Sequence, residues 1–481
     1  MSFEAALAEV LPHGALLIDE EAKRPFECDG LSAYTAMPRV VCLPETAAQV
    51  EAVLKACREH GVPIVPRGAG TGLSGGALPL AEGCVLSLAR LNRILEIDPA
   101  NRVAVVEPGV RNLAISEAAA RHGLYYAPDP SSQIACSIGG NVAENSGGVH
   151  CLKYGLTVHN VLGVKLLLSS GEWLELGGKV LEAPGLDLLA LVNGSEGLLG
   201  LVMEVTVKLL PRPPAAVVLQ VAFATPEAAA GAVAAIIEAG ITPGGLEMMD
   251  KLATRCAEEF AHAGYPLDAG AVLLCELDGT LEEVAEQCEV VEAIMMREGA
   301  SSVRRSRDEA ERLLIWKGRK SAFPAMGRIA PDYYCMDGTI PRRQLAHVLT
   351  RIAELSTEYG LPVANVFHAG DGNLHPLIAY DANDAAQLQT AERLGAKILE
   401  LCIEVGGTIT GEHGVGVEKI DQMCVQFSAP ELAQFHRIKA AFDPAGLLNP
   451  GRAVPTLHRC AEFGAMHVRG GRLPHPELER F

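Results

Sequence analysis

Two short stretches of this chain carry the residues that are best suited to chemistry. His368 and His375 flank a Gly-Asp-Gly-Asn turn, and apolar, strand-like runs lie on either side of it. This pattern predicts a β-hairpin that brings the two imidazoles together. Glu412 and His413 are neighbours in a segment loosened by three glycines. The set favours a divalent-metal site with a general base beside it, although histidines on such turns are also typical of ordinary loops.

Three glycine-rich stretches in the N-terminal half are suited to holding phosphate groups. The first, residues 67–76, has five glycines within ten residues. Such a backbone allows positive φ angles and the close approach of N–H groups to phosphate oxygens. The second stretch covers 128–148 and the third covers 194–200. Each alone is typical of a turn cluster, but three in one span favour an extended diphosphate-bearing ligand.

The first stretch contains Gly70-x-Gly72-x-x-Gly75, which matches the dinucleotide-binding fingerprint. That interpretation requires a helix that opens at the third glycine. Here a segment with Pro79 follows, and then an apolar strand at 84–88. The sequence therefore argues against a dinucleotide fold and keeps the phosphate-binding loop.

Composition excludes several classes of protein. The chain has 481 residues and a net charge of −19, so a basic nucleic-acid-binding surface is absent. None of its 13 cysteines has C-x-x-C spacing, which argues for free thiols and against a cysteine-ligated iron–sulfur cluster. The acidic N-terminus does not resemble a signal peptide, and no apolar run is long enough to span a membrane. We expect a cytoplasmic protein, or a peripheral one that partners hold at a membrane.

The chain divides at the linker Pro211-Arg-Pro-Pro214. Short strands between glycine loops precede it, and alternating strands and helices follow it. The second pattern predicts an α+β fold in which an antiparallel sheet carries helices on one side. We expect domains at 1–213 and 214–409, a return segment at 410–455 that completes the site, and a C-terminal tail at 456–481.

In their order along the chain, these motifs resemble the vanillyl-alcohol oxidase/p-cresol methylhydroxylase (PCMH) flavoprotein superfamily. The glycine loops look like its two-part FAD-binding domain. The histidine hairpin, the Glu412 segment and Asn449-Pro-Gly are similar to the C-terminal half of its 2-hydroxy-acid dehydrogenases, which act on substrates such as D-lactate and D-2-hydroxyglutarate. Residues 331–341 and 459–464 are most similar to the flavin subunits of bacterial glycolate oxidases.

The resemblance assigns roles to individual residues. It implies FAD, bound noncovalently because no histidine lies near Thr71. It makes His368, His375 and Glu412 the ligands of a divalent metal, usually zinc, with His413 as the catalytic base; adjacency alone leaves the reverse assignment of Glu412 and His413 open. The residues expected to bind FAD are Pro66, Arg67, Gly68, Ala69, Gly70, Thr71, Gly72, Ser74, Gly75, Gly76, Pro130, Ser131, Ser132, Ser137, Gly139, Gly140, Asn141, Asn145, Gly147, Gly148, Glu196, Gly200 and Asn449.

Arg319 matches the arginine that clamps the substrate carboxylate, whereas its neighbours Lys317 and Lys320 are expected to face solvent. Relatives that take longer diacids have a threonine and a lysine where this chain has Phe323 and Cys335. The loss of both polar groups predicts a short substrate, so we expect oxidation of glycolate to glyoxylate and of D-lactate to pyruvate.

The resemblance also implies partners, namely a second flavin-type subunit and an iron–sulfur subunit that accept electrons, at the inner face of the membrane. Three alternatives remain open from the sequence. The enzyme could prefer another 2-hydroxy acid, such as D-2-hydroxyglutarate. The His and Glu residues could serve a metal hydrolase, or the chain could be a non-catalytic flavin-binding subunit.

Overall fold

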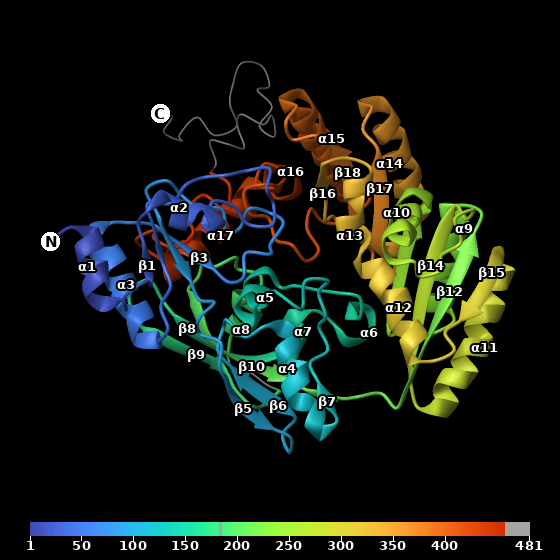
Figure 1. Cartoon of the computed structure of the whole chain (residues 1–481), viewed down its shortest axis with the longest axis horizontal. Helices are drawn as coiled ribbons and strands as arrows, with labels where there is room; N and C mark the ends of the chain where they lie inside the picture. Colours follow the sequence, from blue (N-terminus) through green and yellow to red (C-terminus); the bar gives the residue numbers. More distant parts are fainter. Residues whose placement is uncertain (182–184, 457–481) are drawn as a thin grey trace.

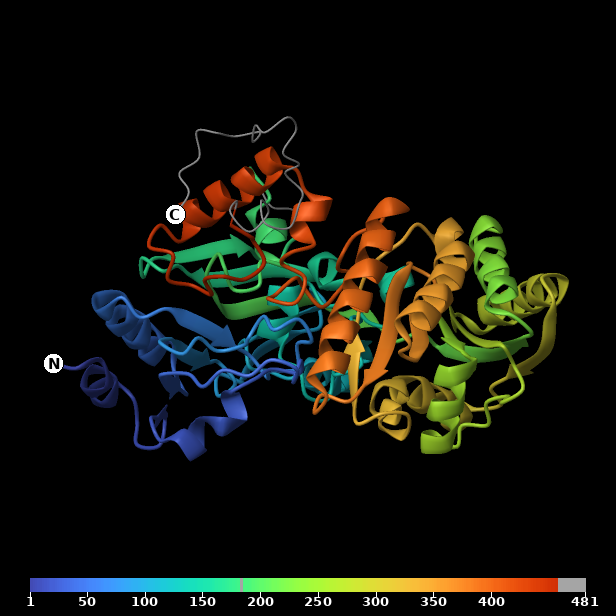
Figure 2. The same ribbon diagram turned by 90° about the horizontal axis from the view of Figure 1, so that it is seen from above.

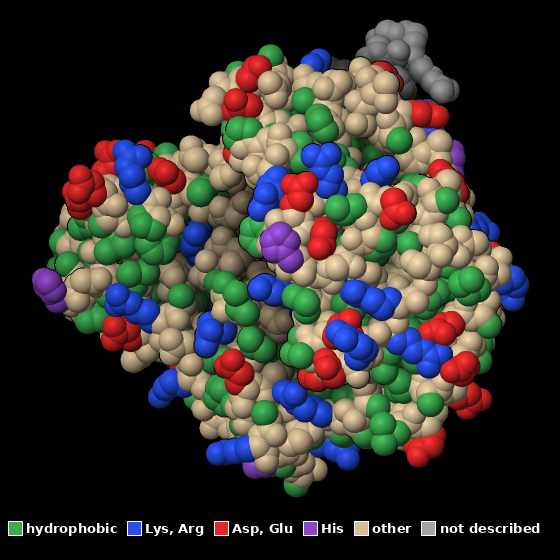
Figure 3. All heavy atoms as spheres, turned by 45° about the vertical axis from the view of Figure 1, so that its right-hand side comes forward, with side chains coloured by type: hydrophobic (Ala, Val, Ile, Leu, Met, Phe, Trp, Pro, Cys, Tyr) green, Lys and Arg blue, Asp and Glu red, His purple; other side chains and the backbone are tan. Residues whose placement is uncertain are grey.

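The computed structural model describes residues 1–181 and 185–456, and its chain forms two lobes (Figure 1). Within these residues the strands form sheets of four, five, two and seven strands. The surface is hollowed between a smaller and a larger lobe, with lysine and arginine side chains beside the hollow (Figure 3). The predicted tail, apart from its first residue, lies outside the described residues, and so does the stretch 459–464.

The four-stranded sheet has the order β1-β2-β4-β3, in which β2, β4 and β3 are parallel and β1 is antiparallel. Two helices pack beside this sheet and share a core with it. The longer helix begins at Thr46, whose side chain accepts from the N–H of Gln49, and ends at Gly61 in the left-handed region. The bounds are β1 Leu16–Leu17, β2 Val40–Cys42, β3 Ile64–Arg67, β4 Cys84–Ser87, α1 Phe3–Val10 and α3 Ala47–His60; a short α2 covers Glu20–Lys23.

The five-stranded sheet is antiparallel, in the order β5-β6-β10-β8-β9. A core of mostly valine, leucine and isoleucine side chains joins it to α4 and α5. The bounds are β5 Ile94–Asp98, β6 Val103–Val106, β8 Val161–Leu167, β9 Trp173–Gly177, β10 Leu201–Lys208, α4 Asn112–Ala119, α5 Ile138–Glu144, α6 Cys151–Tyr154, α7 Thr157–Asn160 and α8 Leu188–Val192; β7 Leu124–Tyr125 pairs with β11 Leu210–Pro211.

The second lobe contains the predicted antiparallel sheet. Its seven strands have the order β15-β12-β14-β13-β17-β18-β16, and every neighbouring pair is antiparallel. The α+β class expected from the sequence is therefore confirmed. The bounds are β12 Ala215–Phe223, β13 Gly245–Asp250, β14 Ala271–Gly279, β15 Ala300–Arg305, β16 Asp332–Cys335, β17 Val363–His368 and β18 Asn373–Tyr380.

Helices cover both faces of this sheet, and not one face as predicted (Figure 2). Alternate residues of β14 point into two separate cores: Leu273 and Cys275 into one, and Val272 and Leu274 into the other. Strands that are apolar on both faces require a cover on each side. One side is covered by α9 Pro226–Glu238, α11 Leu281–Arg297, α14 Leu345–Tyr359 and α15 Ala385–Glu404, and the other by α10 Lys251–Ala261, α12 Glu309–Lys320 and α13 Ala322–Ala325.

The helix α10 is not predicted from the sequence, because it has few large apolar residues. Its buried positions include Ala253, Thr254, Cys256 and Ala257, and its other face carries charges. The sequence nevertheless contains signals for this helix, because its small apolar and charged residues separate with a helical period and Asp250 provides an N-cap by accepting from the N–H of Ala253.

The chain finally returns to the first lobe through α16 Met423–Gln426 and α17 Ala429–Phe442. Beyond α17, Leu448 forms a parallel bridge with Ile64 of β3. Asn449 donates its backbone N–H to the Ile64 carbonyl at 2.7 Å. This crossing places residues distant in sequence beside the first glycine loop.

Candidate active site

The hairpin predicted around the two histidines is present. β17 and β18 pair with His368 opposite Asn373 and Val366 opposite His375. This register puts both histidines on one face of the sheet, one diagonal step apart. Their ring centroids are 5.0 Å apart, and both side chains are buried.

Glu412 lies against both imidazoles, since its Oε1 is 3.3 Å from Nε2 of His368 and 3.2 Å from Nε2 of His375. The ligand atoms of the three residues can converge on one cation. Nδ1 of His368 lies 2.7 Å from Glu247, which fixes the ring and leaves Nε2 facing Glu412. Both ring nitrogens of His375 are buried without an aligned hydrogen-bond partner in the described structure. These residues therefore fit a divalent metal.

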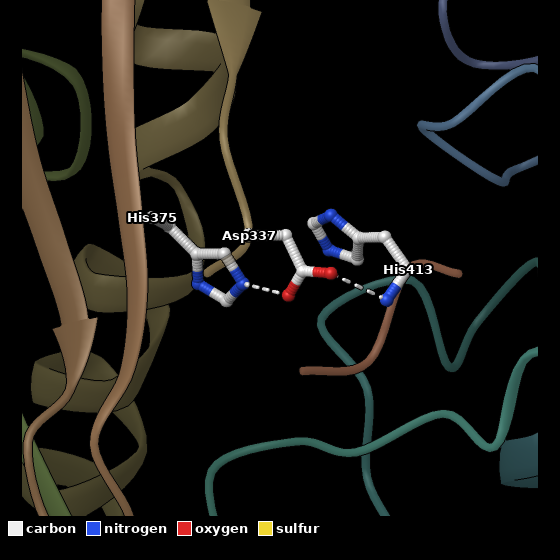
Figure 4. A group of neighbouring side chains, drawn as sticks. All are labelled: Asp337, His375 and His413. Carbon is white, nitrogen blue, oxygen red and sulfur yellow. Dashed lines mark hydrogen bonds and ion pairs between the residues drawn. The ribbon is translucent and has the colours of Figure 1, made fainter. Parts of the chain in front are cut away.

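Asp337 and His413 form a second group around His375 (Figure 4). The rings of His375 and His413 are stacked, with centroids 4.9 Å apart and planes at 14°. Asp337 Oδ1 lies 3.5 Å from Nε2 of His375, and its other oxygen accepts the backbone N–H of His413 at 2.9 Å. His375 thus belongs to both groups.

Asp337, which is not predicted from the sequence as a site residue, organises the loop that carries Glu412 and His413. It is fully buried and accepts the backbone N–H groups of Gly411 at 3.1 Å and Glu412 at 3.2 Å, in addition to that of His413. Burial opposes its ionisation, but Lys419 and the neighbouring histidines together outweigh this and hold the pKa of Asp337 well below its usual range. A permanent carboxylate therefore fixes this loop.

His413 is a neutral imidazole at physiological pH. Burial disfavours the imidazolium and lowers the pKa of His413 to about 4, although Asp337 acts in the opposite direction. The Ser74 hydroxyl donates to the His413 carbonyl at 2.9 Å, which ties this residue to the first glycine loop. A neutral ring in a fixed position is suited to accepting a proton.

Arg319 lies in the last turn of α12 and is only 1% exposed. Its Nη2 is 2.6 Å from Oε2 of Glu247, and its Nε is buried without a partner in the described residues. Glu247, also not predicted from the sequence, therefore joins Arg319 to His368. An arginine with unused donors in this position can bind a carboxylate.

The prediction that Lys320 faces solvent is wrong, whereas Lys317 is exposed as expected. Lys320 is half-buried, and its Nζ lies 3.1 Å from Asp129. It is the last residue of α12, where the second glycine loop approaches the helix end. The helical period alone could not show this approach.

One cavity of about 440 Å³ joins these residues to the glycine loops. Its lining includes Arg319, Lys320, Phe323, His368, His375, Glu412 and His413. Of the residues predicted to bind FAD, the following also line the cavity: Pro66, Arg67, Gly68, Ala69, Gly70, Thr71, Gly72, Gly76, Pro130, Ser131, Ser132, Ser137, Gly139, Gly140, Asn141, Glu196 and Gly200. Ser74, Gly75, Asn145, Gly147, Gly148 and Asn449 are not among its lining residues.

Asn449 instead connects two of the loops. Its side-chain amide donates to the carbonyls of Gly76 at 3.0 Å and Glu196 at 2.8 Å. The Glu196 carboxylate accepts the N–H groups of Val415 and Gly416, each at 2.7 Å. The third glycine loop is thus bound to the loop that carries His413.

The first glycine loop has the form of a cradle. A Cβ at Gly68 would lie 2.3 Å from the Ser137 hydroxyl, so the first and second loops approach each other only because no side chain intervenes. Gly70 has φ +73°, which favours glycine. No helix lies between Gly75 and β4, as expected, so the dinucleotide fingerprint is a coincidence of spacing.

Comparison with known proteins shows the family to which this chain belongs. Residues 38–177 match the family model of an FAD-binding domain, and residues 212–453 match the C-terminal domain of FAD-linked oxidases. The chain belongs to the FAD-linked oxidases. The glycine-lined cavity of this FAD-linked oxidase fits the cofactor that the family binds, and the flavoprotein resemblance seen in the sequence is confirmed.

Individual relatives agree with this assignment. The chain is 63% identical over 476 residues to the glycolate oxidase subunit GlcD of Escherichia coli, covering 99% of this chain and 95% of the relative. It is 34% identical to a D-lactate dehydrogenase of Archaeoglobus fulgidus, covering 87% and 92%. A p-cresol methylhydroxylase structure has the same fold, with a TM-score of 0.80 at 18% identity over 95% of this chain and 97% of that one. No helix in the described part of this oxidase is long and apolar enough to cross a membrane.

Proposed function

We propose that this protein oxidises a short 2-hydroxy acid, chiefly glycolate to glyoxylate and also D-lactate to pyruvate. One observation carries the proposal: a single cavity is lined by the glycine loops, by Arg319 and His413, and by the three residues that could hold a metal, His368, His375 and Glu412. A cavity of this kind brings an FAD-binding surface, a carboxylate-binding arginine and a base to the same small molecule. The names of the GlcD and D-lactate dehydrogenase relatives support this substrate class.

In this mechanism the substrate carboxylate pairs with the guanidinium of Arg319, which leaves the hydroxyl towards His413. A ring nitrogen of His413 takes the hydroxyl proton as the hydride leaves the α-carbon. FAD, when bound, accepts that hydride. Glu412 is the less suitable base, because it lies against His368 and His375 and its pKa is well below the usual range despite burial.

His368, His375 and Glu412 would hold the metal, which we propose to be zinc. A divalent ion there would lower the pKa of the substrate hydroxyl. The contact between Glu247 and His368 supports this choice of ligands, because metal-binding histidines usually donate their other nitrogen to a carboxylate.

Phe323 supports a short substrate. It lines the cavity, with its ring centroid 5.7 Å from that of His375 and 6.1 Å from that of Tyr333. Cys335, the other position where longer-substrate relatives are polar, is buried in the apolar core behind them. A second carboxylate would therefore meet an aromatic ring and would lose its solvation without a partner.

We further propose that FAD binds noncovalently, because Thr71 and its neighbours offer no histidine for a covalent link. Residues 1–213 would bind FAD, 214–409 would form the substrate domain, and 410–455 would complete the site. Electrons would leave through a second flavin-type subunit and an iron–sulfur subunit. These partners would hold this cytoplasmic protein at the inner face of the membrane.

Product analysis tests the substrate assignment. Purified protein with FAD, zinc and an artificial electron acceptor should convert glycolate faster than D-lactate, and D-2-hydroxyglutarate slowest. Faster turnover of the diacid would replace the proposal with a D-2-hydroxyglutarate dehydrogenase. FAD-loaded protein that oxidises none of them would indicate a non-catalytic subunit. The FAD-binding family speaks against the metal hydrolase considered from the sequence.

A further inference from the structure

Lys320 gives the active cavity a cation that the mechanism above does not use. The described residues that line the cavity include three cationic side chains, Arg67, Arg319 and Lys320. Arg67 belongs to the first glycine loop, where its Nη1 donates to the Cys28 carbonyl at 2.7 Å. Arg319 and Lys320 are therefore the two cations that α12 brings to the cavity.

Arg319 is not a free positive charge. Its guanidinium lies 2.6 Å from the Glu247 carboxylate, and each side chain is only 1% exposed. Glu247 therefore compensates part of the positive charge of Arg319, although Nε of Arg319 has no partner among the described residues. A second cation in the same cavity would therefore strengthen the binding of a hydroxy-acid carboxylate by Arg319.

Lys320 can supply it. A lysine ammonium has three N–H donors, and among the described residues one of them meets a partner, Asp129 at 3.1 Å. The side chain is 27% exposed, so it is neither locked in the core nor free in solvent.

A closed ring of polar contacts holds Lys320 in place. Asp129 is 3.0 Å from Nδ1 of His150, and Nε2 of His150 is 3.0 Å from Glu276. Glu276 in turn contacts Arg312 at 2.7 Å, and Arg312 lies on the same helix as Lys320. The ring thus begins and ends on α12 and passes through the second glycine loop. It fixes the end of the helix against that loop.

We propose that Lys320 is a second cationic binding residue of the cavity, pairing with the substrate carboxylate beside Arg319, and that His150 is the positioning residue that holds it there through Asp129. The proposal rests on the proposed function for the identity of the natural ligand. Binding of a carboxylate to the cavity can be tested separately from the oxidation of a hydroxy acid.

The first test measures binding of acetate, a carboxylate that has no hydroxyl to oxidise, through its perturbation of flavin absorbance. Loss of a charge-assisted contact should weaken acetate binding in K320M by roughly 10- to 100-fold, and raise KM for glycolate by a similar factor. K320R should recover most of the affinity. K317M, on the exposed side of α12, is the matched control and should bind acetate as the wild type does.

An unchanged acetate affinity in K320M would overturn the proposal. So would a K320M variant that binds acetate normally but shows a lower flavin reduction potential, because the cation would then serve the cofactor. If wild-type protein binds acetate in a Lys320-dependent way but is not reduced by glycolate, the proposed function fails and the carboxylate site stands.

The second test is a double-mutant cycle for His150. H150F should weaken acetate binding as K320M does, and the double variant should be no weaker than K320M alone, since both changes remove one contact. If H150F folds poorly, D129N provides the same comparison without a change of volume. Additive losses would contradict a positioning role for His150.

Discussion

Asp337 and Lys419 form an ion pair of 3.1 Å in which neither side chain is exposed. Asp337 also accepts the backbone N–H of His413, and Lys419 donates to the Gly414 carbonyl at 2.9 Å. The pair thus holds both ends of the turn that carries His413, the proposed base. A buried pair of this kind is costly to break because the remaining buried charge loses its counter-ion.

Replacing either member alone should therefore destabilise the enzyme. We expect D337N and K419M each to lose about 3–5 kcal/mol of unfolding free energy. Both should also show slower flavin reduction, because the turn around His413 loses its anchor. Chemical denaturation measures the first effect and stopped-flow absorbance the second. The exposed pair of Lys55 and Glu59, at 3.9 Å, supplies the control K55M, which should lose less than about 1 kcal/mol. Equal stability of all three variants would refute this role.

His413→Ala should separate chemistry from cofactor binding. We expect the variant to retain FAD, since His413 is at the catalytic end of the cavity, and to reduce it roughly 10²–10⁴ times more slowly than the wild type. Single-turnover kinetics at saturating glycolate gives the rate. His347, exposed on α14, provides the control His347→Ala with an unchanged rate. Wild-type reduction in His413→Ala would remove this residue from the mechanism.

Phe323 should set the upper limit of substrate length. Phe323→Thr removes the ring that contacts His375 and adds a hydroxyl to the cavity wall. We expect kcat/KM for D-2-hydroxyglutarate to rise about tenfold, equivalent to about 1.4 kcal/mol, relative to that for glycolate. Phe260→Thr, at an exposed position on α10, is the control. An unchanged ratio would mean that another residue limits the substrate.

The ring through His150 predicts a pH dependence of stability. Burial disfavours the imidazolium, but Asp129 and Glu276 outweigh this and raise the pKa of His150 to about 10, above its ordinary 6.5. A raised pKa means stabilisation that is fully present below pH 6.5 and is lost as pH rises through 10.

The difference in melting temperature between wild type and H150F should therefore be largest at about pH 6, smaller at about pH 8 and smallest at about pH 10. H347F, at an exposed histidine, corrects for general effects of pH. A constant difference between wild type and H150F would show that His150 is not charged in the folded protein.

The sequence alone is sufficient to predict those parts of the site that lie within short segments of the chain. His368 and His375 lie on strands joined by a recognisable turn, so the hairpin pattern by itself implies their contact. Glu412 and His413 are adjacent, and glycine loops have a local signature. In each case the information lies within a short segment, or in a family resemblance that spans the chain.

The supporting acids could not be predicted in this way. Glu247 lies in a short strand that also contains Asp250, and its role depends on Arg319 and His368, which are distant in sequence. The roles of Asp337 and Asp129 likewise depend on residues that are distant in sequence. The sequence misleads at Lys320 because a helical period indicates a direction but not which loop approaches the helix end. The second helical layer on the sheet could not be predicted because a helical period does not show on which face of a sheet a helix packs.

Anaerobic reduction by glycolate tests the central claim most directly. Protein reconstituted with FAD and zinc should lose its absorbance near 450 nm, roughly where oxidised flavins absorb, when glycolate is added without oxygen. Removal of the metal by a chelator should slow this bleaching, and added zinc should restore it. A zinc-loaded yellow protein that glycolate leaves oxidised would contradict the account.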